Sequence, residues 1–206
     1  MSAKDDLYEY LIYYPEGYTE KKKEDFPLMI FLHGAGERGT DISKVKIHGP
    51  PMKIEAGETY PAIVVAPQCP EDIRWDTDRL EELLQDIIKT NRVDESRIYL
   101  TGLSMGGYGT WAWSIENPEH FAAIAPICGG GEIENISRIK DIPTWVFHGA
   151  QDNVVPLEKS QEMVDALIAV GGKPNFTIYP EADHDSWTIT YNNPKFYEWM
   201  FNQKRQ

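Results

Sequence analysis

The sequence predicts an α/β protein, in which a mostly parallel central sheet carries helices on both faces. Two observations favour this fold class. Apolar runs without polar alternation recur along the chain, and such runs are typical of strands buried on both faces of a parallel sheet. Amphipathic helical patterns lie between these runs, and alternating strands and helices imply right-handed crossovers that cover both faces.

Seven segments have the composition of strands. The first, "LYEYLIYYP", is rich in residues that favour strands, and the next five are apolar runs that end at turn residues. The seventh is shorter and more polar, as an edge strand would be. These strands are expected over residues 7–15, 26–34, 61–68, 96–102, 121–129, 142–149 and 174–182.

Helical patterns lie between the predicted strands. The clearest pattern covers residues 77–92, where apolar residues recur at i, i+3, i+4, i+7 and i+8 and form one face. Its members are Leu80, Leu83, Leu84, Ile87 and Ile88. Further helices are expected over residues 105–117, 157–170 and 193–204. Residues 34–61 show little periodicity, and a long connection of this kind in a compact domain is usually functional.

Length and charge narrow the possible roles. A chain of 206 residues with 41% hydrophobic residues suits one domain, expected over residues 1–206. The net charge of −13 argues against nucleic acid and anionic membranes as partners. No apolar stretch reaches the length of a membrane helix. The acidic start, "MSAKDDLYEY", differs from a secretory signal, so a cytoplasmic location is expected.

The sequence offers no sign of a metal or cofactor. The two cysteines, Cys69 and Cys128, form no CxxC pair and no Cys/His cluster at zinc spacing. We therefore expect no metal site and no cofactor, and each cysteine to behave as a small buried hydrophobic residue.

The stretch "GLSMG" at residues 102–106 predicts a nucleophile at Ser104. It follows a predicted strand and precedes a predicted helix, which is the context in which a Gly-x-Ser-x-Gly pattern forms a sharp, strained turn. Side chains two positions away would collide in such a turn, which explains the flanking glycines. The alternative is a glycine-rich structural turn with a capping serine.

A serine alcohol needs a base, and His184 is favoured among the five histidines. His184 lies in the polar loop after the last predicted strand, and His48 in the long connection is the alternative. The other histidines look structural; they are His33, His120 and His148. Asp152 follows the penultimate predicted strand and supplies the acid, which completes the chain order Ser, Asp, His.

Two backbone N–H groups are expected to form an oxyanion hole. Met105 supplies one group at the start of its helix, and Ala35 in "LHGAGERG" supplies the other. Glu37 and Arg38 are expected to brace the second loop as an ion pair.

Together these segments resemble the α/β-hydrolase fold. The stretches "FLHGAGERG", "GLSMGGYGTW", "HGAQDNVVP" and "DHDSW" resemble a single-domain esterase branch. This branch contains predicted peptidases, phospholipase/carboxylesterase-like proteins and feruloyl or polyhydroxybutyrate-depolymerase-like esterases. The resemblance covers residues 7–200 and implies that Ser104 is the nucleophile, Asp152 the acid and His184 the base. A cysteine at the nucleophile position would suggest dienelactone hydrolysis, whereas serine points to acyl transfer to water.

The sequence departs from the family pattern in two places. The strand from residue 7 leads almost directly into the next one, so the usual eight-stranded sheet is expected to be shortened at its N-terminal edge. Only a short segment separates Cys128 from Ile142, where many relatives insert a helical lid, so we expect no lid domain and an open cleft.

The usual strand order of this fold also predicts the state of the cysteines. Two strands would separate those that precede Cys69 and Cys128, which places the cysteines ~14 Å apart at ~4.8 Å per strand. A disulfide needs α-carbons within ~7 Å, so two free thiols are expected.

These features predict a serine carboxylesterase that hydrolyses short-acyl or hydroxycinnamoyl (feruloyl-type) esters, on small molecules or linked to polysaccharide. Trp75, Tyr108 and Trp187 are candidate substrate contacts, with hydrophobic packing beneath the loops as the alternative for each tryptophan. A serine peptidase on the same triad and a non-catalytic binding protein that kept the fold are the alternative functions.

Overall fold

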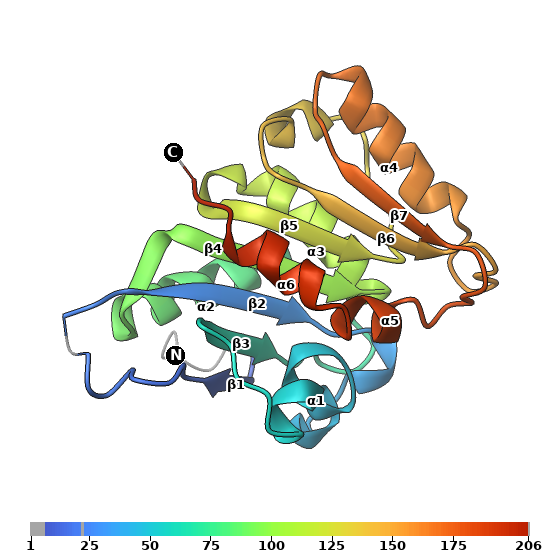
Figure 1. Cartoon of the computed structure of the whole chain (residues 1–206). Coiled ribbons are helices and arrows are strands. Elements are labelled where there is room, and N and C mark those ends of the chain that lie inside the picture. Colours follow the sequence, from blue (N-terminus) through green and yellow to red (C-terminus); the bar gives the residue numbers. More distant parts are fainter. Residues whose placement is uncertain (1–6, 22, 206) are drawn as a thin grey trace.

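The computed structural model describes residues 7–21 and 23–205. One seven-stranded sheet has the order β1-β3-β2-β4-β5-β6-β7, and in this sheet only β1 pairs antiparallel with its neighbour (Figure 1). This topology confirms the predicted fold class. The strands are β1 (Tyr10–Tyr13), β2 (Phe26–Leu32), β3 (Ile63–Pro67), β4 (Val93–Leu103), β5 (Phe121–Ile127), β6 (Trp145–Gly149) and β7 (Asn175–Tyr179).

Helices lie between the strands, and two of them are absent from the sequence-based prediction. The α-helices are α1 (Gly49–Glu55), α2 (Thr77–Thr90), α3 (Met105–Glu116), α4 (Glu158–Ala169), α5 (Trp187–Tyr191) and α6 (Pro194–Phe201). The unexpected ones are α1 and α5, with seven and five residues, because such short helices do not complete a recognisable apolar repeat. The described part of the chain also contains the 3-10 helices η1 (Ala35–Glu37), η2 (Ile42–Ile47), η3 (Pro118–His120) and η4 (Ile136–Ile139).

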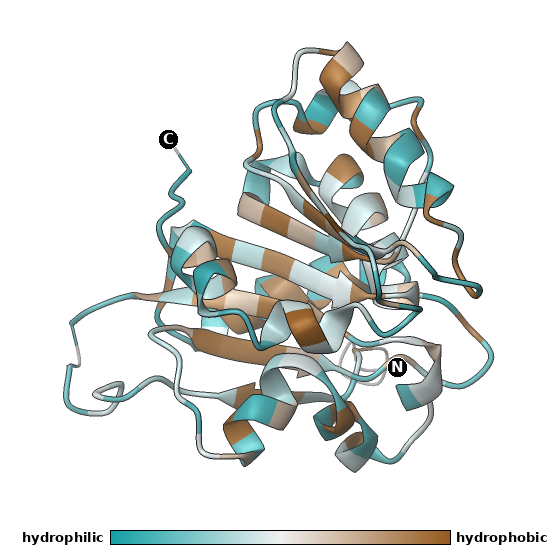
Figure 2. Cartoon of the chain, turned by 45° about the vertical axis from the view of Figure 1, so that its right-hand side comes forward, coloured by the Kyte–Doolittle hydropathy of each residue, from teal (hydrophilic) through white to brown (hydrophobic). Residues whose placement is uncertain are grey.

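The sheet separates two hydrophobic cores. Along β2, Leu28, Ile30 and Leu32 face one core and Met29 and Phe31 face the other. The first core takes buried residues from α2, α3 and α4, and the second takes them from α5 and α6. Burial on both faces explains why this strand shows no polar alternation. Figure 2 shows hydrophobic residues gathered on the central strands and hydrophilic ones on the loops.

Both edges of the sheet agree with the sequence-based expectations. Strand β1 forms a short N-terminal edge, and β7 forms the opposite, partly exposed edge. Residues 128–144, all of which the structure describes, contain the 3-10 helix η4 and no α-helix. No helical lid is therefore inserted between β5 and β6.

The two cysteines are buried free thiols, as predicted. Strands β2 and β4 lie between β3 and β5, after which Cys69 and Cys128 follow. Among residues 7–21 and 23–205, no helix combines the length with the hydrophobicity that a membrane span requires.

The parallel strands deliver the functional loops to one edge of the sheet. Strands β2, β4, β5, β6 and β7 run in the same direction, so their carboxyl ends lie together. Binding and catalytic sites of open α/β sheets form at this edge.

Candidate active site

Ser104 stands at the turn from β4 into α3 with φ 52° and ψ −116°, a conformation that side chains rarely adopt. A Cβ atom at Gly102 would lie 2.4 Å from the carbonyl oxygen of Gly106. One at Gly106 would lie 2.0 Å from the carbonyl oxygen of Leu32. Both glycines are therefore required by close backbone approach, as the sequence indicated. Strain of this kind costs about 1–3 kcal/mol and clusters at functional sites.

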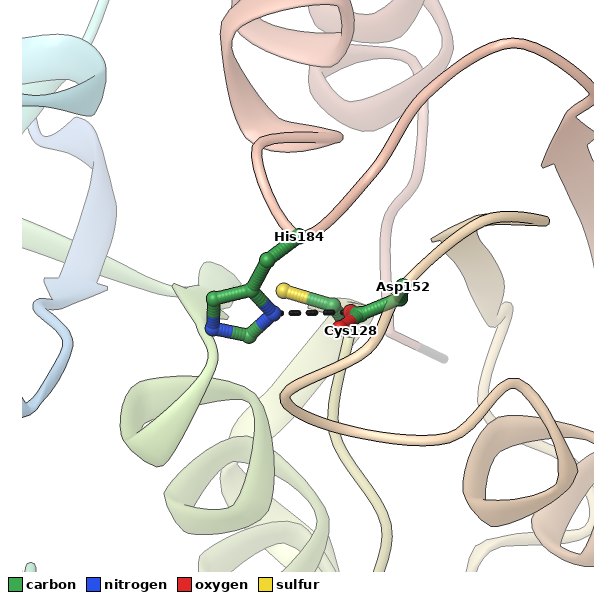
Figure 3. Close-up of side chains that lie close together, drawn as sticks. All are labelled: Cys128, Asp152 and His184. Carbon is green, nitrogen blue, oxygen red and sulfur yellow. Dashed lines mark hydrogen bonds and ion pairs between the residues drawn. The ribbon is translucent and has the colours of Figure 1, made fainter.

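The three predicted triad residues meet in one hydrogen-bonded series. His184 Nε2 lies 3.0 Å from Ser104 Oγ. On the other side of the ring, His184 Nδ1 lies 2.7 Å from Asp152 Oδ2 (Figure 3). His184 comes from the loop after β7 and Asp152 from the loop after β6. This geometry is that of a nucleophile, a base and an acid that holds the base in place.

The carboxylate of Asp152 is buried and well supplied with donors. Its Oδ1 accepts the backbone N–H groups of Val154 and Val155, both at 2.9 Å. Burial raises the pKa of Asp152, but the hydrogen bonds from His184 and from these two N–H groups together outweigh burial and hold that pKa below its ordinary value. Asp152 is therefore ionised at neutral pH.

His148 also contacts the carboxylate of Asp152. From the sequence, only a structural role is expected for His148. Its Nε2 lies 2.9 Å from the carbonyl oxygen of Val155 and 3.3 Å from Asp152 Oδ2. Both neighbours are acceptors, so Nε2 carries a proton and donates. Its Nδ1 lies 2.7 Å from Ser160 Oγ, which anchors the ring. The sequence could have indicated this contact, because His148 lies at the end of the predicted strand that precedes Asp152, four residues before it.

His48, the alternative base, does not hydrogen-bond to Ser104. Its Nε2 lies 3.8 Å from Glu37 Oε1, and its ring packs edge-on against Trp187 at 5.4 Å. The same indole ring packs edge-on against His184 at 5.1 Å. Trp187, the first residue of α5, therefore packs against both histidine rings.

The other histidines take structural positions. His33 is buried, and its Nε2 accepts the N–H of Cys69 at 2.9 Å. Burial lowers the pKa of His33 to about 4, so its ring is neutral. His120 pairs with Glu81 at 2.9 Å, away from Ser104.

The two residues expected to form the oxyanion hole begin helices beside Ser104. Met105 is the first residue of α3 and Ala35 the first of η1, and N–H groups in a first turn have no acceptor within the helix. A Cβ atom at Gly34 would lie 3.7 Å from the Cβ of Ser104. The loop that carries Ala35 therefore lies directly against the serine.

Glu37 and Arg38 brace this loop, but not as the expected ion pair. Glu37 Oε2 accepts the N–H of Gly34 at 2.9 Å. Arg38 instead donates to the carbonyl oxygens of Ala35 and Ile73, at 3.0 and 3.1 Å. Glu37 points inward and is 7% exposed, whereas the Arg38 side chain bridges two loops. The two charges therefore serve different backbone groups.

A cavity of about 450 Å³ adjoins the start of α3. Met105, Tyr108 and Ala112 line it from the helix, and Trp75 lines it from the opposite loop. Trp75 is 8% exposed, and its Nε1 donates to the carbonyl oxygen of His33 at 3.2 Å. Trp75 thus combines packing beneath the loop with a place in the cavity wall.

Cys128 is a residue of the site that sequence reasoning missed. It follows β5 with φ 41° and is fully buried. Its sulfur, a carboxylate oxygen of Asp152 and a ring nitrogen of His184 all lie within 4.8 Å of one another (Figure 3). Burial raises the pKa of this thiol to about 12, so it is protonated at neutral pH.

Comparisons with known families and proteins identify hydrolases that this chain resembles. The sequence profile of the dienelactone hydrolase family matches residues 60–194. A putative carboxymethylenebutenolidase of Escherichia coli K12 is 32% identical over 103 residues, which are 46% of this chain and 38% of that protein. A probable feruloyl esterase C of Aspergillus terreus is 26% identical over 171 residues, which are 80% of this chain and 62% of that protein.

A solved structure gives a similar result. A thermostable esterase superposes with a TM-score of 0.82 at 38% identity, over 95% of this chain and 59% of that one. The chain therefore spans less than two thirds of the length of each of these three relatives.

Proposed function

Because the chain belongs to the dienelactone hydrolase family, we propose that it is a serine carboxylesterase that works through an acyl-enzyme intermediate. The observation that carries this proposal is the series Asp152, His184 and Ser104, joined by contacts of 2.7 and 3.0 Å. Position 104 is serine, not the cysteine that would suggest dienelactone hydrolysis. A serine in this setting favours transfer of an acyl group to water.

The proposed reaction begins when Ser104 Oγ attacks the ester carbonyl carbon and His184 Nε2 takes the hydroxyl proton. His184 then protonates the leaving alcohol, which departs and leaves the acyl group on the serine. A water molecule then attacks the acyl carbon while His184 takes its proton. The bond between the acyl carbon and Ser104 Oγ breaks, His184 returns the proton to Oγ, and the carboxylic acid leaves. Asp152 remains ionised throughout and stabilises the imidazolium form of His184.

The N–H groups of Met105 and Ala35 are proposed to bind the oxyanion. Each donor of this kind typically contributes ~3–4 kcal/mol to transition-state stabilisation. Their positions at the first residues of α3 and η1 support this assignment, because neither group is used inside its helix.

The cavity beside α3 supports the proposed substrates, which are short-acyl or hydroxycinnamoyl esters. Its volume of about 450 Å³ lies within the ~300–1,000 Å³ usual for small-ligand sites. Tyr108 and Trp75 are proposed to hold a flat aromatic acyl group, and Trp187 to contact substrate beside His184. The absence of an α-helix in residues 128–144 leaves room for an ester attached to polysaccharide as well as for a free small molecule.

A single labelling experiment tests the reaction class. We expect a fluorophosphonate probe to label the wild-type chain and not the Ser104→Ala variant. A panel of short alkyl esters, methyl ferulate and aminoacyl anilides then tests the substrate. Labelling without hydrolysis of any ester would contradict the esterase proposal, and cleavage of the anilides alone would favour the peptidase alternative.

The proposal keeps two sequence-based expectations, a single domain over residues 1–206 and a cytoplasmic location. The single domain is proposed from the length and the hydrophobic content of the chain. The net charge of −13 supports an uncharged ester over nucleic acid as the partner.

A further inference from the structure

Three side chains with good metal-binding atoms converge behind the reactive serine. Cys128, Asp152 and His184 come from the loops after β5, β6 and β7, and their ligand atoms all lie within 4.8 Å of one another. Figure 3 shows the sulfur of Cys128 directed toward the imidazole ring of His184, beside the carboxylate. The three residues lie far apart in sequence, so no short sequence motif predicts that they come together.

We infer that these residues form an inhibitory site for a thiophilic divalent cation such as Zn²⁺, and that the bound ion inactivates the esterase. The inhibition rests on the proposed function, whereas the binding rests on the geometry alone. Sulfur, imidazole nitrogen and carboxylate oxygen are the donor types that Zn²⁺ takes, in tetrahedral sites at ~2.0–2.3 Å. Mg²⁺ and Ca²⁺ prefer oxygen ligands only.

The required adjustment of the ligands is small. Tetrahedral geometry at those bond lengths places ligand atoms roughly 3.3–3.8 Å apart. His184 Nδ1 and Asp152 Oδ2 are now 2.7 Å apart and must separate. The sulfur of Cys128, which lies within 4.8 Å of a ring nitrogen of His184 and of a carboxylate oxygen of Asp152, must approach them. The nitrogen and oxygen must separate by about 0.6–1.1 Å, and the sulfur must approach by at most about 1.5 Å. All three residues lie on loops at the same edge of the sheet.

The charges of the bound state balance. A cation that binds the Cys128 sulfur displaces the thiol proton to solvent. The resulting thiolate and the Asp152 carboxylate carry two negative charges, which the divalent cation neutralises. The fourth position belongs to water or to the hydroxyl of Ser186, which is buried beside this thiol and has no hydrogen-bond partner of ordinary geometry among the described residues.

Inhibition follows from the tautomer of the base. In the free site, His184 Nδ1–H donates to Asp152 and Nε2 accepts the proton of Ser104. A cation bound to Nδ1 takes the place of that hydrogen. The neutral ring then carries its proton on Nε2, which can no longer accept the serine proton. The ion also separates His184 from Asp152. The base therefore loses both the tautomer that accepts the serine proton and its hydrogen bond to the carboxylate.

The test compares Zn²⁺ inhibition of three proteins: the wild type, Cys128→Ser, and Cys69→Ser as the matched control. Cys69 is the other buried free thiol, and it belongs to no cluster of metal-binding residues in the described part of the chain. Each rate is expressed relative to that protein's own rate with a chelator. Loss of an outer partner of a metal costs 10–100-fold in affinity, so we expect loss of the sulfur ligand to weaken Zn²⁺ inhibition at least about 10-fold. Cys69→Ser should match the wild type, and Mg²⁺ should not inhibit.

A second readout does not depend on activity. Co²⁺ bound to a thiolate gives a ligand-to-metal charge-transfer band, which we expect in the wild type and Cys69→Ser and not in Cys128→Ser. Equal Zn²⁺ sensitivity of Cys128→Ser and wild type would overturn the inference. The absence of a charge-transfer band in the wild type would also overturn the inference, and this result does not require Cys128→Ser to fold. A band in a protein that hydrolyses no ester would leave the metal site standing and remove the proposed function.

Discussion

Substitutions of His148 test how strongly the function of the buried Asp152 carboxylate depends on the imidazole that contacts it. We compare two substitutions of this residue, His148→Leu and His148→Gln. The leucine removes every hydrogen bond of the imidazole, whereas the glutamine amide places an N–H donor near the position of Nε2. Both remove the ring, so their difference reports mainly on the proton that points toward Asp152.

The magnitude follows from the contact distances. His148 Nε2 lies 3.3 Å from Asp152 Oδ2 and 2.9 Å from the carbonyl oxygen of Val155, so its one N–H is shared. A hydrogen bond to a charged group contributes about 1.5–3 kcal/mol, and a long, shared one falls at the low end. A loss of about 1.4 kcal/mol in the transition state lowers kcat about 10-fold. KM should change little, because His148 does not line the cavity.

The assay is the steady-state rate on an ester that the wild type hydrolyses, with the thermal midpoint measured for each variant. We expect His148→Leu to lose about 10-fold in kcat and His148→Gln to recover most of that loss. Both should melt earlier than the wild type, because the contact with Ser160 is weakened in each. Equal kcat values for the two variants would refute the positioning role. A loss that appears in KM alone would do the same.

Two further substitutions test the local geometry. Asp152→Asn should lower kcat by about 10⁴-fold, because an amide no longer holds the required tautomer of His184. The lowered pKa of Asp152 means that its ionised form stabilises the fold above the ordinary value of 3.8, and this contribution is lost as the pH falls through the lowered pKa. The difference in thermal midpoint between wild type and Asp152→Asn should therefore shrink in acid, and a constant difference would contradict this linkage. Gly106→Ala should destabilise the fold by about 1–3 kcal/mol or more, since its Cβ would lie 2.0 Å from the carbonyl oxygen of Leu32. Gly36→Ala is the control, because its Cβ would meet nothing within 4 Å; equal thermal midpoints would contradict the steric account.

The sequence by itself determined those features that depend on local chain chemistry. Unbroken apolar runs indicated a sheet buried on both faces, and β2 divides its side chains between two cores. The pattern around Ser104 indicated a strained turn, because only glycine tolerates backbone atoms so close to its α-carbon. His184 and Asp152 followed from their place after successive strands, since parallel strands end at a common edge.

Only the tertiary structure decided which side chains touch at that edge. The contact of Asp152 with His148 and the position of Cys128 beside Asp152 and His184 depend on how the loops after β5, β6 and β7 pack. No spacing along the chain encodes a distance between separate loops. The short helices α1 and α5 were also hidden, because packing rather than a periodic apolar face holds a single turn or two of helix. The prediction of an ion pair between Glu37 and Arg38 was also wrong, because the packing of the loop decides which groups these side chains meet. Glu37 and Arg38 are neighbours in sequence, but in the folded loop beside Ser104 each hydrogen-bonds to a different backbone group.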